Sequence, residues 1–338
     1  DGRIISNTTN SDSVVNYGLQ SCKMELESGK EYDFLIEYKC RGGWCIIQFG
    51  IEPESFIGEE REKAIELAKK SDVVVLGVGF TAETEGEGND RSFYFNANLE
   101  LLIKGVLDAN PNTLICAYAG GGFDMSGWLD KTRGLLMMWY PGQEGGTAAA
   151  ELIFGKSSPS GKLPISIESR PEDRSSFDCY HDSDNDLRVQ VADGIFCGYR
   201  GFDKSAITPL FPFGYGLTYS TFKYESLKLS SRKINKKGKV KVSVQIRNIG
   251  DFKAAEIVML FISDVKSSFP RPLKELKDFE KIELEPNEKG KVSFKIGWDE
   301  LKFFDPDRKK WLAEKGVFKV LVGSNAEDIK LVAKIELA

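Results

Sequence analysis

Residues 72–80, DVVVLGVGF, decide the fold, because this short apolar run has the length and composition of a buried strand. The preceding residues 60–70 carry apolar side chains on one helical face. A second helix is predicted over residues 96–110, and Pro111 ends it. A strand between two helices is the repeating unit of an α/β fold.

The alternation of strands and helices continues beyond this segment. Strands are predicted at residues 113–119, 134–140 and 162–167, and an Ala-rich helix at residues 143–154. This order predicts an α/β sandwich, a mainly parallel sheet covered on both faces. In such sheets ligands bind at the carboxyl ends of the strands.

Two β-rich regions flank this α/β core. Short alternating strands are predicted in the last third of the chain, at residues 240–246, 255–262, 292–296 and 318–322. Their regular spacing predicts an immunoglobulin-like β-sandwich of about one hundred residues. Residues near the start also alternate like strands but are too few for an independent sheet. We therefore expect three parts, residues 1–56, 57–220 and 221–338.

Composition narrows the classes of function. The chain has 338 residues, enough for two or three domains, and a net charge of −5. That charge argues against a nucleic-acid surface or a polybasic membrane surface, and no apolar run approaches the roughly 18 residues of a membrane span. The chain begins with Asp1 and shows no signal peptide, so we expect a processed product or a fragment and leave the compartment open.

The cysteines do not indicate a metal or redox centre. None of the six lies in a Cys-x-x-Cys pair, so a zinc ribbon and a redox motif are not expected. Cys116 lies in an apolar strand and is expected to be a small core residue. A disulfide between Cys40 and Cys45 stays open.

An acidic loop follows the first strand. Residues 81–91, TAETEGEGNDR, contain Glu83, Glu85 and Glu87, and two glycines flank the last of these. Glycine relaxes the backbone, so this loop suits an unusual presentation of Glu87. Crowded carboxylates favour keeping one of them protonated, and a protonated carboxyl is what a general acid needs. A solvated acidic loop is the alternative, but the position beyond a strand end favours a functional site.

Three other motifs are weak. Gly77 and Gly79 begin a dinucleotide fingerprint, but its third glycine is absent and the acids that follow would repel a pyrophosphate. Residues 182–186, DSDND, resemble the start of a calcium loop, but Leu187 stands where that loop needs glycine. His181 is the only histidine, and no serine lies in a nucleophile elbow, so a serine or cysteine catalytic triad is not expected. We therefore predict no cofactor and no metal.

Residues 139–146, WYPGQEGG, join a core strand to a helix. One interpretation is a structural joint with Glu144 in the first helical turn, where the helix dipole favours an acid. The other is a sugar-binding crevice, because an aromatic ring such as that of Trp139 stacks against sugar rings. Arg91 is expected to pair with a nearby acid and to order the acidic loop.

Six segments together resemble one family. They are EGNDR at 87–91, WYPGQEGG at 139–146, PSGKLP at 159–164, GYR at 198–200, FPFGYGLTY at 211–219 and PRPLKELKDF at 270–279. In this order the chain is similar to the non-barrel part of a glycoside hydrolase family 3 enzyme of the β-glucosidase kind. The resemblance implies an α/β sandwich domain at 57–220 and a fibronectin type III-like domain at 221–338. It also implies that residues 1–56 are the end of an inserted protective-antigen-like β-sandwich.

The resemblance also implies a reaction. Family members release terminal β-linked sugars with retention, using two carboxylates about 5–5.5 Å apart. Glu87 would be the general acid/base, and Glu85, Asp90, Arg91 and Trp139 would support the loop or lie near the substrate. The nucleophilic aspartate would lie on a (β/α)8 barrel that this sequence does not contain. The expected partners are therefore a β-glucoside or related oligosaccharide and a barrel domain or subunit, and a homo-oligomer is compatible with the sequence.

Two alternatives to an enzyme remain open from the sequence. The chain could be a non-catalytic carbohydrate-binding or scaffold module of the same fold, or a flavodoxin-like nucleotide-binding protein. The sequence also departs from the family at two places. Residues 92–96, SFYFN, replace a leucine-rich segment that ends in proline, and the turn at 120–123, GGGF, lacks the usual proline. These departures leave the substrate preference and the path of the loop near Glu87 open.

Overall fold

The structure is a computed structural model that describes residues 27, 29–31, 54–88, 90–179, 188–189, 191 and 193–338. The chain divides into two compact units. The first unit contains Asp1–Gly120 and Ser126–Trp139, and the second contains Gly121–Met125 and Tyr140–Ala338. Nearly all of the predicted N-terminal β-segment lies outside the described residues. The domain boundaries near residues 57 and 221 stay predictions, because a compact unit can hold parts of more than one domain.

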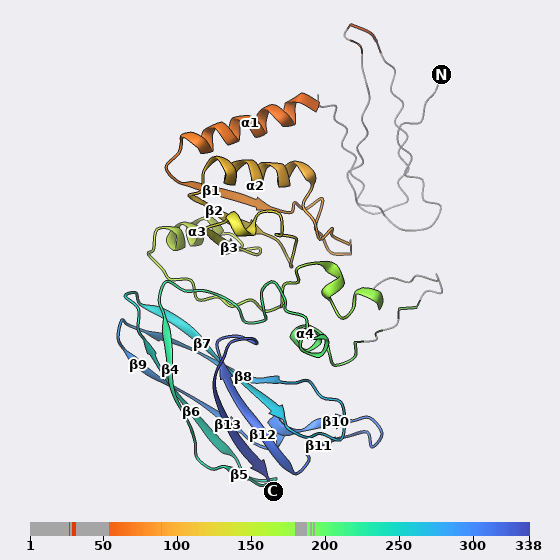
Figure 1. Cartoon of the computed structure of the whole chain (residues 1–338), viewed down its shortest axis with the longest axis vertical. Helices are drawn as coiled ribbons and strands as arrows, with labels where there is room; N and C mark the ends of the chain where they lie inside the picture. The colour runs from red at the N-terminus through yellow and green to blue at the C-terminus, as the bar shows by residue number, and fades with distance from the viewer. Residues whose placement is uncertain are drawn as a thin grey trace. The chain divides into compact units, whose positions relative to one another are not determined.

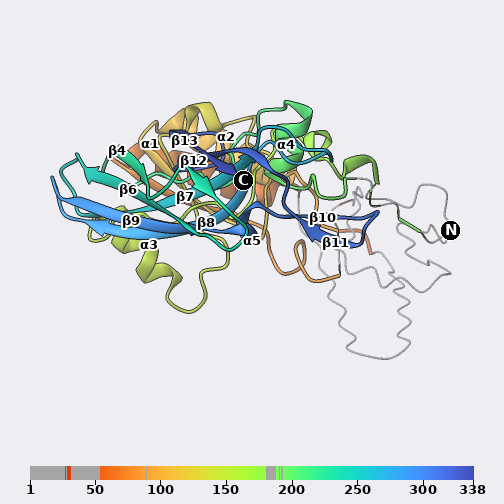
Figure 2. The ribbon, with the colours of Figure 1, turned by 90° about the horizontal axis from the view of Figure 1, so that it is seen from below.

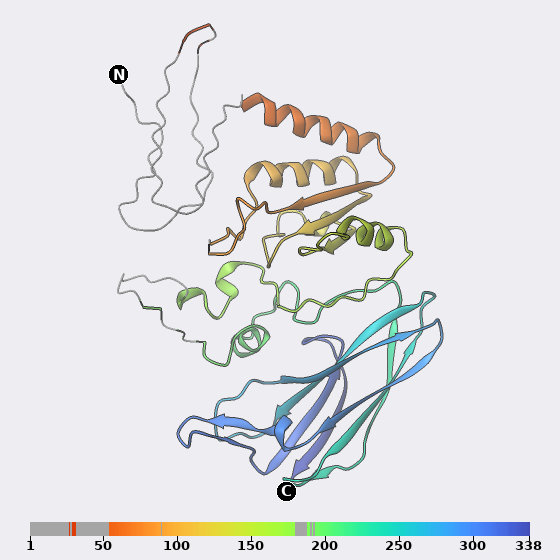
Figure 3. The ribbon, with the colours of Figure 1, turned by 180° about the vertical axis from the view of Figure 1, so that it is seen from behind.

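The first unit is the parallel α/β part of the chain. Its elements are α1 (Glu54–Lys70), β1 (Val74–Gly79), α2 (Ala97–Ala109), β2 (Thr113–Tyr118), the 3-10 turn η1 (Leu129–Lys131) and β3 (Gly134–Met137). The strands pair in parallel in the order β1-β2-β3, which confirms the parallel sheet for three of the four predicted strands. Helices α1 and α2 lie side by side (Figures 1 and 3).

Helix α2 shows how local sequence sets an element. The side chain of Asn96 accepts a hydrogen bond of 2.9 Å from the backbone N–H of Leu99 and caps the helix. Its apolar face buries Ile103, Val106 and Leu107. The helix therefore begins and ends within one residue of the predicted range.

Gly79 is required for packing rather than for a nucleotide. A Cβ atom at this position would lie 2.3 Å from the carbonyl oxygen of Tyr118 in the neighbouring strand β2. No residue with a side chain fits there, so glycine allows β1 and β2 to approach. The second glycine of the incomplete dinucleotide motif thus has a structural explanation.

The α/β elements of the second unit are short. They are α3 (Gly145–Ile153), α4 (Tyr199–Ser205) and the 3-10 turns η2 (Pro171–Asp173) and η3 (Phe177–Cys179). The predicted strand at 162–167 is wrong, because only Ile167 forms a bridge, to Phe211. Leu163 also pairs with the backbone of residues 214 and 215, but Pro164 between these two contacts has no N–H to donate.

The rest of the second unit is a β-sandwich. Its elements are β4 (Phe222–Leu229), β5 (Lys233–Ile234), β6 (Val240–Asn248), β7 (Ala254–Asp264), β8 (Glu275–Leu284), β9 (Lys289–Ile296), α5 (Trp298–Leu301), β10 (Phe303–Asp305), β11 (Lys310–Leu312), β12 (Gly316–Gly323) and β13 (Ile329–Leu337). One sheet has the order β5-β13-β12-β7-β8 and the other β4-β6-β9. Strands β4, β6 and β9 run side by side in Figures 1 and 2, and β10 and β11 form a separate hairpin.

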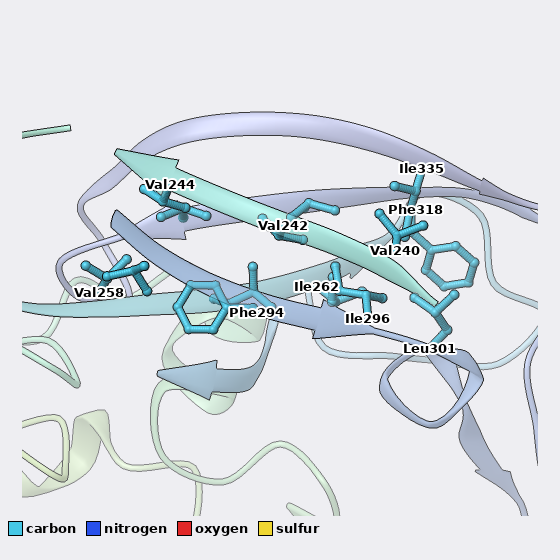
Figure 4. Packing of buried hydrophobic residues seen from close by; sticks show 14 of the residues in the cluster. Val240, Val242, Val244, Val258, Ile262, Phe294, Ile296, Leu301, Phe318 and Ile335 are labelled. Carbon is cyan, nitrogen blue, oxygen red and sulfur yellow. The ribbon is translucent and has the colours of Figure 1, made fainter. Parts of the chain in front are cut away.

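The core of the sandwich follows from period-two alternation. Strand β6 buries every second side chain, including Val242 and Val244, and exposes or half-exposes those between. Phe294 of β9 and Phe318 of β12 fill the same core (Figure 4). Each such side chain contributes about 1.5–3 kcal/mol on burial, so the sandwich carries a large apolar core of its own.

Candidate functional site

The acidic loop lies at the carboxyl edge of the parallel sheet in the first unit. The backbone ladder continues one residue past β1 and β3, with Phe80 N–H donating to Tyr118 O (3.1 Å) and Met138 N–H to Ala117 O (2.8 Å). Because the strands are parallel, the loop from Thr81, the turn at Gly120 and the end of β3 leave the sheet at one edge.

Glu85 anchors this loop. Its Oε1 atom lies 2.8 Å from Arg91 Nε, and its Oε2 atom accepts a hydrogen bond of 3.0 Å from the backbone N–H of Gly120. Only 14% of the Arg91 side chain and 15% of the Glu85 side chain are exposed. Both carboxylate oxygens of Glu85 are therefore engaged in structure, and Arg91 makes the acid pair that the sequence predicted.

Aromatic rings support the same pair. The Arg91 guanidinium lies over the ring of Phe80, 4.2 Å from its centroid, and the centroids of Phe80 and Phe95 are 4.8 Å apart. Phe93 and Phe95 are buried. The segment SFYFN, which departs from the family pattern, is thus an aromatic anchor for the closing end of the loop.

Glu83 takes a local role. The loop begins with a tight turn in which the N–H groups of Thr84 and Glu85 donate to Thr81 O at 3.0 and 2.9 Å. The Thr81 hydroxyl donates to Glu83 Oε2 at 2.8 Å. Glu83 is exposed, so its carboxylate faces both this hydroxyl and solvent.

Glu87 differs from the other two glutamates. It is exposed, and among the described residues no hydrogen bond or ion pair involves its carboxylate. Gly88 beside it has a φ of +79°, a left-handed conformation that side chains disfavour. Asp90 is also exposed. The frame therefore holds Glu85 in place and presents Glu87 to solvent.

Trp139 follows strand β3 at the same edge of the sheet. It is half-buried and has a φ of 53°, an unusual conformation for a bulky residue. Strain of this kind is concentrated at functional sites, where it fixes the direction of a side chain. Glu144 precedes α3 as its N-cap residue rather than lying in the first turn, and its Oε2 accepts a hydrogen bond of 3.0 Å from Thr147 Oγ1.

Sequence reasoning missed Phe80 and Phe95 as supports of the loop. A phenylalanine at the last position of a strand, followed by alternating aromatics at 93 and 95, is the signal that could have identified them. The calcium-like segment at 182–186 and His181 lie outside the described residues.

The described part of the chain offers no cluster of metal ligands. No group of three His, Cys, Asp or Glu side chains is placed there to hold a metal ion. None of the helices described has the length and hydropathy of a membrane span. Cys116 is buried, as predicted, and burial raises the pKa of its thiol.

Comparisons with known proteins agree with the motifs. Residues 5–219 match the glycosyl hydrolase family 3 C-terminal domain, and residues 256–326 match a fibronectin type III-like domain. A beta-glucosidase of Rhizobium radiobacter is 35% identical over 322 residues, covering 92% of this chain and 39% of that protein. A beta-glucosidase of Bacteroides ovatus is 36% identical over 285 residues, covering 82% of this chain and 38% of that protein.

Solved structures show the same relationship. The family 3 beta-glucosidase of Bifidobacterium adolescentis has a TM-score of 0.78 at 31% identity, covering 83% of this chain and 41% of that one. The beta-glucosidase of Kluyveromyces marxianus in complex with glucose has a TM-score of 0.77 at 36% identity, with 83% and 33% covered. The chain thus spans about two fifths or less of the length of these relatives.

The first of the two domain matches alone covers more than half of the chain, and the α/β sheet and the β-sandwich follow one another in the order of the two matches. The chain therefore belongs to glycosyl hydrolase family 3.

Proposed function

We propose that this chain is the acid/base-bearing part of a retaining, exo-acting β-glucosidase, with Glu87 as the general acid/base. The observation that carries the proposal is the difference in contacts between the three glutamates of the loop. Arg91 and Gly120 engage Glu85, the Thr81 hydroxyl engages Glu83, and Glu87 projects without a described partner. Of the three, Glu87 is the one whose carboxyl has no described contact that would compete with a substrate.

The reaction needs Glu87 in two protonation states. As an acid it donates its proton to the glycosidic oxygen while an aspartate attacks the anomeric carbon. As a carboxylate it then takes a proton from the water that hydrolyses the covalent intermediate. The aspartate would come from the barrel of the complete enzyme, placed about 5–5.5 Å from the Glu87 carboxyl.

The remaining residues of the site hold this acid in place. The Glu85–Arg91 pair on the Phe80 ring ties the two ends of the loop together, and the glycines beside Glu87 give it room to turn. Trp139 offers an aromatic face at the same sheet edge, which would stack against a sugar ring. Asp90 lies next to Arg91 and would help to close the loop. The substrate class is a β-linked glucoside, since the similar proteins are named beta-glucosidases.

The test is Glu87→Ala in the complete enzyme, with an aryl β-glucoside as substrate. We expect kcat to fall by about 10²–10⁴-fold, the usual contribution of a general acid/base, and azide to restore turnover of a substrate with a good leaving group. Glu83→Ala is the matched control, because Glu83 is also exposed and its described contact is a hydrogen bond that it accepts from Thr81. Full activity of Glu87→Ala would contradict the proposal and favour a non-catalytic carbohydrate-binding or scaffold module.

A further inference from the structure

A polar pocket lies wholly within the second unit, beside strands β4 and β7 and the segment that precedes β4. Its volume is about 260 Å³, the space of roughly eight or nine liquid waters. Sites for drug-sized ligands start at about 300 Å³, so this pocket suits a smaller guest.

Buried charges line the pocket. Lys162 Nζ lies 3.1 Å from Glu256 Oε1 and donates to Gly216 O at 2.8 Å, and both charged side chains are less than a tenth exposed. Lys330 Nζ lies 2.7 Å from Asp328 Oδ2 at the more open side. Two ammonium groups face two carboxylates, so the formal charge cancels and neither a free cation nor a free anion is favoured.

One residue that lines the pocket, Tyr224, carries an unsatisfied donor. The Tyr224 hydroxyl is buried and has no hydrogen-bond partner among the described residues. Burial, with smaller contributions from Glu256 and Asp328, raises the pKa of this phenol, so it stays protonated and remains a donor. The hydroxyl is closed to water, so a ligand reaches it only after a small shift of a neighbouring side chain.

The walls between the polar groups are apolar. Phe222, Tyr224 and Leu217 line the pocket, and Leu217 is 72% exposed. A neutral lining that alternates donors, acceptors and apolar faces matches a molecule whose hydroxyl groups both donate and accept on an apolar carbon frame. We propose that this pocket binds a small neutral polyhydroxylated molecule, of the size of a monosaccharide.

The test measures binding of glucose and glycerol to the full 338-residue chain by ligand-observed NMR and by the shift in Tm. We expect saturable binding of glucose, weaker binding of glycerol, and none of acetate or ammonium ions. Leu217→Trp should fill the mouth and abolish binding. Leu273→Trp is the matched control, because Leu273 is similarly exposed and does not line the pocket.

Two variants test whether glucose binds in this pocket rather than at the acidic loop. Tyr224→Phe should weaken glucose binding about five- to tenfold, the value of one hydrogen bond, without lowering the Tm of the protein alone. Glu87→Gln should leave this binding unchanged, so the result does not depend on the proposed acid/base. The proposal is overturned if glucose does not bind, if Leu217→Trp binds it normally, or if Glu87→Gln abolishes the binding.

Discussion

The β-sandwich core and the acidic loop are held together in different ways. The sandwich distributes its stability over many buried side chains, contributed by both of its sheets. The acidic loop is held by directional contacts, which include the largely buried Glu85–Arg91 ion pair, the hydrogen bond from Gly120 and the contact of Arg91 with Phe80. Substitution of a single residue should therefore have different consequences in the two regions.

This difference matches the role that we propose for each region. A sandwich needs only to keep its shape, and burial is a non-directional force that achieves this. A loop that presents a general acid needs a fixed path, and the directional contacts of Glu85 with Arg91 and Gly120 provide one for the loop that carries Glu87. We expect changes in the sandwich to appear as lost stability and changes in the loop as lost turnover.

The largest effect should follow from Phe318→Ala in the sandwich core. Phe318 is fully buried, and truncating such a ring costs about 3–5 kcal/mol through lost burial and the cavity left behind. Urea unfolding followed by tryptophan fluorescence would measure the loss. The control is Phe304→Ala, since Phe304 is 49% exposed and should cost far less. Equal losses in the two variants would show that the core is not where the sandwich gains its stability.

The next effect should follow from Arg91→Met in the loop. Removing the guanidinium leaves the Glu85 carboxylate without its ion pair and frees the loop, and a small misplacement of a catalytic group costs about 10²-fold in rate. We expect kcat to fall by that order in the complete enzyme while KM changes little and the Tm falls by only a few degrees.

Two controls sharpen this result. Arg91→Lys keeps the charge but not the planar guanidinium over Phe80, so it should recover part of the activity. Azide should not rescue Arg91→Met, because the carboxyl of Glu87 is still present. A large loss of Tm with unchanged kcat would instead make the pair a stability element like those of the sandwich.

The two regions also differ in how far sequence predicts them. Strands β6 and β12 were predictable because inward and outward side chains alternate over a long run. Strand β8 is harder to find, since its charged residues interrupt the pattern and Phe279 is exposed. The strand predicted at 162–167 does not form. Pro164 within it argues against a paired strand, but the apolar pattern led to the wrong prediction.

The loop shows why a site is harder to predict than a fold. Three glutamates look alike in sequence, and the glycine frame with the family motif selects Glu87. The role of Glu85 depends on Gly120, which is 35 residues away and meets it only once β1 and β2 pair. No local sequence pattern indicates this contact, so it is found only in the tertiary structure.

The smallest effect should come from acid titration of Glu275 in the sandwich. Burial by itself raises the pKa of Glu275, but Lys277 and Arg271 together lower it below its ordinary value. A carboxyl with a lowered folded-state pKa stabilises the fold above its unfolded pKa, and this stabilisation is lost as the pH falls through the folded value. The urea midpoint of the wild-type protein should therefore fall below about pH 4.5 partly because of Glu275.

Glu275→Gln should remove that part of the pH dependence, since a neutral amide does not titrate. The variant should be less stable than wild type near neutral pH, and the difference should shrink as the solution is acidified. Glu280→Gln is the control, because Glu280 is an exposed acid on the same strand. If the gap between Glu275→Gln and wild type stays constant across the titration, the Arg271 and Lys277 contacts do not stabilise the charged form. The contacts of Glu275 would then add nothing to the stability that apolar burial gives the sandwich, and the contrast with the loop would be sharper.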